Sequence, residues 1–177
     1  TYAVEKIADD AFNGSHITAI TLPLSIKTIG VTAFANCKNI EAILFPTSVE
    51  TISNYAFFNC SNLKDVSFGD VKEIGVSAFE GCSSISVLDL PQNLSIIRNG
   101  AFTNCTSLTT LNIPRDLSML YGNTFSGCEK IKEVTFSAAR CNTDGKAFAG
   151  STEFTTLTIS DGVEWIPNHM FENCKYI

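Results

Sequence analysis

The sequence has 177 residues, of which 45% are hydrophobic and 17% are charged, and its 12 basic and 18 acidic side chains give a formal net charge of −6. This acidic balance disfavours nucleic-acid binding, which requires a basic surface. The hydrophobic content is ample for a core, but no apolar run approaches the roughly 20 residues that a membrane helix needs.

A phenylalanine, most often preceded by alanine, returns along the whole chain at intervals of 22 or 23 residues. The eight positions are Phe12, Phe34, Phe57, Phe79, Phe102, Phe125, Phe148 and Phe171. A fixed period in this range is typical of a repeat solenoid, whose coils pack only against their neighbours. The period therefore predicts one right-handed solenoid over residues 1–177, with about seven to eight coils. Because the sequence begins and ends inside a repeat, we expect it to be a piece of a longer repeat protein.

Each repeat begins with the turn that carries this phenylalanine. The second residue after it is always glycine or asparagine, as at Gly14 and Asn36, and these residues most readily adopt the positive φ that ends a helical turn. The pattern therefore predicts a one-turn helix around each phenylalanine and little long α-helix.

A strand and a second apolar pair complete each repeat. The spacing Leu63-x-x-Val66-x-Phe68 recurs in the other repeats, and its alternation predicts a short, half-buried parallel strand. Two more apolar residues, such as Ile26 and Ile29, stand eight and five positions before the next phenylalanine. These two groups of apolar residues are enough to fill a solenoid interior, although one coil could not fold alone.

Residues 137–146 depart from this pattern, because Arg140 and Thr143 replace the second apolar pair. We expect the edge of the solenoid to be looser or rerouted at this point. A degenerate repeat explains the departure more simply than a dedicated site does.

Six of the seven cysteines occupy one position, three residues after the phenylalanine, where the other two repeats have Ser15 and Ser151. Serine is similar in size but cannot form a disulfide, so the exchange favours buried, free thiols with a weak hydrogen bond to the adjacent turn. Disulfides between neighbouring coils and a metal site remain as alternatives. The six cysteines are Cys37, Cys60, Cys82, Cys105, Cys128 and Cys174. Cys141 lies outside this position, in the degenerate repeat, and we expect it to be the most reactive thiol.

The full pattern, Leu-x-x-Ile-x-Ile-Pro-x-x-Leu-x-x-Ile-x-x-x-Ala-Phe-x-x-Cys, resembles the BspA-type leucine-rich repeat. Residues 44–52 and 90–97 are close to this pattern, whereas residues 137–146 and the two serines depart from it. The resemblance covers essentially the whole chain and implies a secreted or cell-surface protein that uses its repeats for adhesion or recognition. It transfers no catalytic residue, cofactor or metal site.

The outward-facing strand residues are the candidate site. Leu44 and Val87 are unusual choices for a solvent-facing position, and Asp65 and Asp89 flank them. We expect a protein or glycan partner, because an open sheet offers area but no enclosed pocket. A solvated, threonine-rich strand face without a partner is the plainer alternative. The candidates are Leu44, Asp65, Ser67, Val87, Asp89, Thr110 and Asn112.

Three other expectations concern function. A passive spacer in a surface protein is the first rival to a recognition module, and a hydrolase is the second. Catalysis has weak support, because His16 and His169 are about seven repeats apart and only a Cys174–His169 pair offers a nucleophile with a base. Finally, repeats without polar caps expose strand edges, which makes end-to-end self-association possible.

Overall fold

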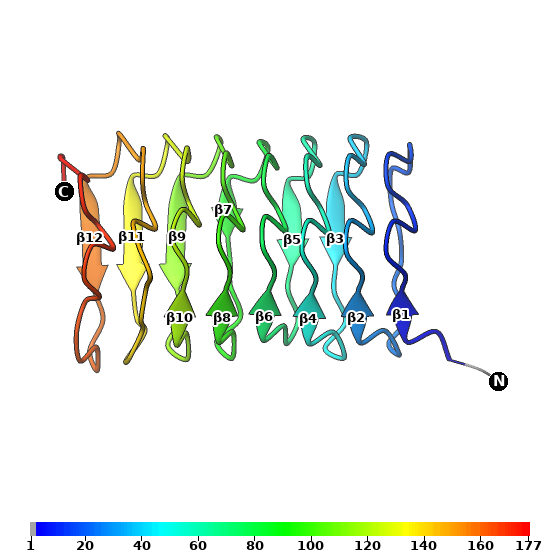
Figure 1. The fold of residues 1–177 in the computed structure, drawn as a ribbon, viewed down its shortest axis with the longest axis horizontal. Helices are drawn as coiled ribbons and strands as arrows, with labels where there is room; N and C mark the ends of the chain where they lie inside the picture. Colours follow the sequence, from blue (N-terminus) through cyan, green and yellow to red (C-terminus); the bar gives the residue numbers. More distant parts are fainter. Residues whose placement is uncertain (1–2) are drawn as a thin grey trace.

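The computed structural model describes residues 3–177, which form a parallel β-solenoid of about seven turns (Figure 1). The coils stand side by side along the long axis of the molecule, with the two ends of the chain at opposite ends of that axis. The described residues contain twelve short strands and no helix. Within this part of the chain, therefore, no helical segment has the length and hydropathy needed to cross a membrane.

The strands fall into two series on different sides of the coil. One series, with strands of two to four residues, follows the six phenylalanine turns from Phe34 to Phe148, as the alternating pattern predicts. These strands are β3 (Ala42–Leu44), β5 (Asp65–Ser67), β7 (Val87–Leu88), β9 (Thr110–Ile113), β11 (Glu133–Phe136) and β12 (Thr156–Ile159). All their pairings are parallel and in the register of the repeat, so Leu88 lies opposite Leu111, and Leu111 opposite Val134.

A second ladder runs along another side of the solenoid. It has the order β1-β2-β4-β6-β8-β10 and consists of two-residue strands that end on the second apolar residue of each repeat. These strands are β1 (Lys6–Ile7), β2 (Thr28–Ile29), β4 (Thr51–Ile52), β6 (Glu73–Ile74), β8 (Ile96–Ile97) and β10 (Met119–Leu120). The sequence pattern identified the buried residues of this ladder but not their pairing.

The segments around each phenylalanine are hydrogen-bonded turns, which corrects the prediction of one-turn helices. Around Phe34, the amides of Ala35 and Cys37 donate within their own turn, to Thr32 and Phe34, while the amides of Phe34 and Asn36 donate to the next coil. A helix would direct all these amides along its own axis. Instead, every second amide of the turn donates to the next coil, so half of these hydrogen bonds join neighbouring coils.

This alternation is accompanied in seven of the eight turns by two left-handed residues, four positions apart. The later one is the predicted glycine or asparagine, for example Asn36 at φ 59°. The earlier one precedes the phenylalanine by two and was missed, because it has no constant residue type and includes threonine, tyrosine and serine, which rarely adopt positive φ. It is filled by Asp10, Thr32, Tyr55, Ser77, Gly100, Asn123 and His169.

The phenylalanines form a stack through the centre of the solenoid. Neighbouring ring centroids from Phe12 to Phe171 are 5.0–5.6 Å apart and the rings are close to parallel. In the degenerate repeat, Arg140 and Thr143 are not buried. Ala138 and Cys141 are fully buried instead and fill this part of the core. The looser edge expected there is confirmed, since the second ladder continues past β10 only as an isolated Met119–Asn142 bridge.

The cysteine column is buried as predicted, and its thiols are free. Each thiol donates to the carbonyl of the phenylalanine in the preceding coil, with Sγ–O distances of 3.0–3.4 Å from Cys37 to Cys128. Cys174 is only partly buried, and its Sγ lies 4.0 Å from the Phe148 carbonyl. The expectation that Cys141 is the reactive thiol is wrong, because its side chain fills the core of the degenerate repeat. Burial raises the pKa of Cys141 to about 12.

We therefore expect a thiol reagent to modify Cys174 first in the folded protein. Only the thiolate reacts, and burial raises the pKa of Cys60 and Cys141 to about 12, so both remain protonated and enclosed at pH 8. Peptide mapping after brief labelling should find the modification at Cys174, with the others labelled only in denaturant. Cys174→Ser, which copies the serine that two repeats have at this position, should abolish the fast phase. Fast labelling of Cys141 would contradict the packing described here.

Candidate functional site

The candidate site is the outward side of the first series of strands, from β3 to β12, which we call the strand face. Strand pairing aligns its residues in rows across the coils: Ala42 pairs with Asp65, Leu44 with Ser67, and Val87 with Thr110. Successive side chains of a strand point to opposite faces, so these residues face solvent when the apolar residues between them face the core. Ile43 and Leu88 are accordingly buried.

The strand face is interrupted between β5 and β7. Backbone pairing divides its strands into a β3-β5 pair and a β12-β11-β9-β7 sheet, while the second ladder is continuous through β4, β6 and β8. We call this interruption the seam. It coincides with a missing residue in the sequence: three residues lie between Phe45 and Val49, but only two lie between Phe68 and Val71. The missing residue lies in the loop that directly follows β5, and the backbones of β5 and β7 do not pair.

Gly69 fits the shortened loop beside the seam. Its φ of +55° lies in the left-handed region, and a Cβ there would lie 2.8 Å from the Phe45 carbonyl oxygen. Other repeats have proline at the corresponding place, as at Pro46 and Pro91. The replacement of proline by glycine and the loss of one residue thus occur together, directly after β5.

A shallow depression of about 560 Å³ covers the strand face from the coil before β3 across the seam to β7. Its floor and walls are mainly apolar, and Leu44 and Val87 are 69% and 60% exposed. A second depression of about 420 Å³ crosses the seam beside it. Both are lined by Val66, Ser67 and Asp89.

The structure brings five of the seven candidate residues together. Leu44, Asp65, Ser67, Val87 and Asp89 line the larger depression. Thr110 and Asn112 lie on β9, the next strand, outside that depression. Six of the seven are exposed, and Thr110 is half-buried.

The seven candidates chosen from the sequence do not include other residues of this depression. Ala19, Ala42 and Ser86 supply small side chains that leave room for it, and Lys64 stands at its edge. The spacing from Phe68 to Val71 was the signal that could have identified the seam, because it is shorter by one residue than in the neighbouring repeats.

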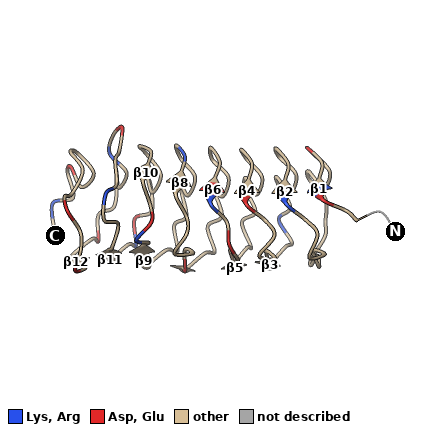
Figure 2. Ribbon diagram, turned by 90° about the horizontal axis from the view of Figure 1, so that it is seen from below, with Lys and Arg blue, Asp and Glu red and all other residues tan. Residues whose placement is uncertain are grey.

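Some charged side chains of this region form ion pairs and others do not. Lys64 pairs with Glu41 at 3.2 Å, and on the second ladder Lys27 pairs with Glu5 and Lys72 with Glu50, also at 3.2 Å. Acidic and basic segments accordingly lie in neighbouring coils near β1, β2, β4 and β6 (Figure 2). Within residues 3–177, Asp65 and Asp89 have no ion-pair partner. The depression therefore combines exposed apolar side chains with two uncompensated carboxylates.

The residues weighed for catalysis do not form a catalytic pair. His16 and His169 lie in coils at opposite ends of the solenoid. His169 Nδ1 is 2.7 Å from Glu172 Oε2, whereas the Cys174 thiol faces the Phe148 carbonyl. Across the described part of the chain, no three His, Cys, Asp or Glu side chains are grouped as metal ligands.

Comparison with protein families gives one match that spans the chain. A model described as "BspA type Leucine rich repeat region" matches residues 1–82 and 69–177, in six copies. No curated protein sequence matches significantly.

Several solved structures share the fold. A leucine-rich repeat protein of T. pallidum is 22% identical with a TM-score of 0.70, over 81% of this chain and 64% of that one. One from Bacteroides ovatus is 27% identical with a TM-score of 0.60, over 97% and 56%. A leucine rich cell surface protein from Faecalibacterium prausnitzii is 22% identical with a TM-score of 0.65, over 89% and 52%. The chain thus spans between about half and two thirds of the length of these structures.

Proposed function

Because this chain belongs to the BspA-type leucine-rich repeat family, we propose that it is a non-enzymatic recognition module, which binds a protein or glycan partner through its strand face. Solenoids offer extended surfaces rather than enclosed pockets, and such surfaces suit macromolecular partners. One of the similar structures is named as a cell surface protein, which supports an extracellular location and a role in adhesion.

The observation that carries this proposal is the composition of the depression at the seam. Leu44 and Val87 expose apolar surface that water solvates poorly, and burial of such side chains stabilises complexes. Asp65 and Asp89 add negative charge that no basic side chain of the described residues neutralises. A partner with an apolar contact surrounded by basic or hydroxyl groups would complement both features.

We expect the triple variant Asp65→Asn, Val87→Thr, Asp89→Asn to lose at least about 2 kcal/mol of binding free energy, roughly 30-fold in Kd. Wild type and variant would be compared on arrays of purified extracellular proteins and of glycans, with each Kd then measured by biolayer interferometry. The three side chains face solvent, so circular dichroism and melting temperature should stay unchanged.

A control triple variant makes the same chemical changes elsewhere: Val31→Thr, Asp116→Asn and Asp161→Asn. These residues are also exposed but lie outside the strand face. The control should bind like wild type. If both triples bind equally well, the strand face is not the recognition surface. If wild type binds nothing on either array, the passive spacer becomes the better description.

A further inference from the structure

The second feature that the repeat pattern does not explain lies between residues 140–150 and residues 163–173, in the last two coils. We call it the wedge. In five earlier coils, the amide four residues before the phenylalanine donates to the preceding coil, as from Gly75 to Ile52 and from Tyr121 to Ile97, both at 2.9 Å. Pro167 occupies this place in the last coil and has no amide proton. The second ladder cannot continue to it.

In the described part of the chain, the turns that carry Phe148 and Phe171 also lack the usual backbone hydrogen bonds at the wedge, although the two rings remain stacked at 5.0 Å. The amides of Phe125 and Gly127 donate to Ala147 and Ala149, at 2.8 and 3.1 Å. Over residues 3–177, Phe148 and Gly150 make no equivalent backbone bonds to the last coil. The opposite side stays closed, because β11 and β12 pair over all four of their residues. Backbone hydrogen bonds therefore join the last two coils along the strand side, whereas the other side has, among the described residues, only the bond from the Glu164 amide to the Ala139 carbonyl, at 3.0 Å.

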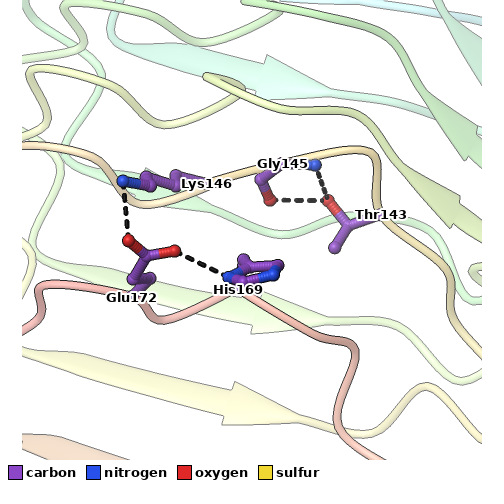
Figure 3. Close-up of polar contacts among 5 residues, drawn as sticks. All are labelled: Thr143, Gly145, Lys146, His169 and Glu172. Carbon is purple, nitrogen blue, oxygen red and sulfur yellow. Dashed lines mark hydrogen bonds and ion pairs between the residues drawn. The ribbon is translucent and has the colours of Figure 1, made fainter.

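Side chains bridge this other side at its two ends. Arg140 Nε lies 2.7 Å from Glu164 Oε2, and Lys146 Nζ lies 2.7 Å from Glu172 Oε1. Figure 3 shows the second bridge, in which Glu172 also contacts His169. Hydrogen bonds from Lys146 and His169 hold the pKa of Glu172 below its ordinary value, so this carboxyl remains ionised. The Arg140 and Lys146 side chains of the wedge are thus each paired with a carboxylate.

The wedge contains the only tryptophan of the sequence, Trp165. Its Nε1 donates to the Cys141 carbonyl at 3.0 Å, which fixes one edge of the ring. The Arg140 guanidinium lies 6.0 Å from the ring centroid and restrains it further. The side chain is nevertheless 42% exposed. A large aromatic ring held in place and left exposed is suited to contact a ligand.

Trp165 lines a cleft of about 310 Å³, at the lower end of the range for small-ligand sites, roughly 300–1,000 Å³. None of the residues that line it is ionisable, and the side-chain amides of Asn142 and Asn168 have no hydrogen-bond partner within the described chain. The lining consists of Asn142, Thr143, Trp165, Ile166, Pro167 and Asn168.

From this lining we propose that the wedge is a saccharide subsite that takes one neutral pyranose residue. A pyranose has an apolar C–H face, which can lie against the Trp165 ring, and a rim of hydroxyls. Each free amide can donate to one hydroxyl and accept from another. A charged ligand has no counter-charge in the lining. The subsite is separate from the strand face, so it does not rest on the function proposed above.

The single tryptophan supplies a direct readout. We would titrate the intact chain with the methyl glycosides of glucose, galactose, mannose and N-acetylglucosamine and with their short oligosaccharides, following Trp165 fluorescence. At least one should give a saturable change. Asn142→Ala and Asn168→Ala should each weaken that binding about tenfold, because each removes hydrogen bonds to the ligand but leaves the fluorophore in place. Asn62→Ala, at an exposed asparagine in a turn outside both the strand face and the wedge, is the matched control and should bind like wild type.

Three outcomes would overturn the proposal: no saturable response to any saccharide, equal affinities for the wedge variants and wild type, or binding of methyl phosphate or acetate instead. A glycan array probed with Trp165→Ala gives a second readout, in which binding should be lost while circular dichroism is retained. The triple variant at Asp65, Val87 and Asp89 should keep its saccharide affinity. That result separates failure of this subsite from failure of the strand-face proposal.

Discussion

Phe79→Ala is expected to lower the free energy of unfolding by about 3–5 kcal/mol, the usual cost of removing a buried phenylalanine. Phe79 is fully buried at the middle of the stack, with ring centroids 5.2 Å from Phe57 and 5.4 Å from Phe102. The truncation leaves a cavity that neighbouring coils cannot close, because backbone hydrogen bonds fix their spacing. Urea unfolding followed by circular dichroism measures the loss.

Phe58→Ala is the matched control. Phe58 follows directly after a stack residue but is only half-buried and packs against Tyr55 instead, with centroids 5.8 Å apart. Removing the Phe58 ring should lower the free energy of unfolding by about 1 kcal/mol, the size expected for an aromatic pair at the surface. Equal destabilisation by the two variants would mean that the stack is not the main source of stability.

Gly75→Ala is expected to destabilise by about 1–3 kcal/mol or more, the range for overpacking, while Gly145→Ala should be neutral or slightly stabilising. A Cβ at Gly75 would lie 2.6 Å from the Asn54 nitrogen and 2.7 Å from the Ser53 carbonyl carbon. These are backbone atoms of the adjacent coil, so a side-chain rotation cannot relieve the clash. At Gly145 the nearest atom is 3.7 Å away.

Neither glycine has a left-handed φ. A difference in stability between the two variants therefore reports the space between adjacent coils and not the conformational preference of glycine. Thermal unfolding of both variants tests the difference. A Gly75→Ala protein that melts at the wild-type temperature would show that adjacent coils can move apart at this point without cost. The close spacing would then not be a requirement of the fold.

The sequence was enough to predict the solenoid, its core and its cysteine column, because these follow from residues that recur at a fixed period. Phe79 and Cys82 are recognisable from the neighbouring repeats alone. The two-residue strands of the second ladder were missed, since residues such as Thr51 and Ile52 are too few to show a strand pattern. Left-handed residues such as Thr32 were missed for another reason: coil-to-coil hydrogen bonds impose that conformation against local preference.

The candidate sites were predicted less well than the fold, because both depend on defects in the repeat. Leu44 and Val87 were identified as unusual exposed residues. The seam beside them coincides with one missing residue between Phe68 and Val71, and an interruption of this kind becomes apparent only once the coils are stacked. The wedge likewise depends on Pro167, whose missing amide is significant only because the earlier coils use that amide to hold the ladder together.

The central claim is that the strand face beside the seam is the surface that meets a partner, and photo-crosslinking tests it most directly. A photoreactive amino acid would replace Ser67 on β5 in one variant and Ser118, next to β10 on the second ladder, in the other. Both serines are exposed and lie in internal coils. With a partner identified on the arrays, the Ser67 variant should form the crosslinked complex and the Ser118 variant should not. Equal crosslinking from both positions, or crosslinking from Ser118 alone, would contradict the claim.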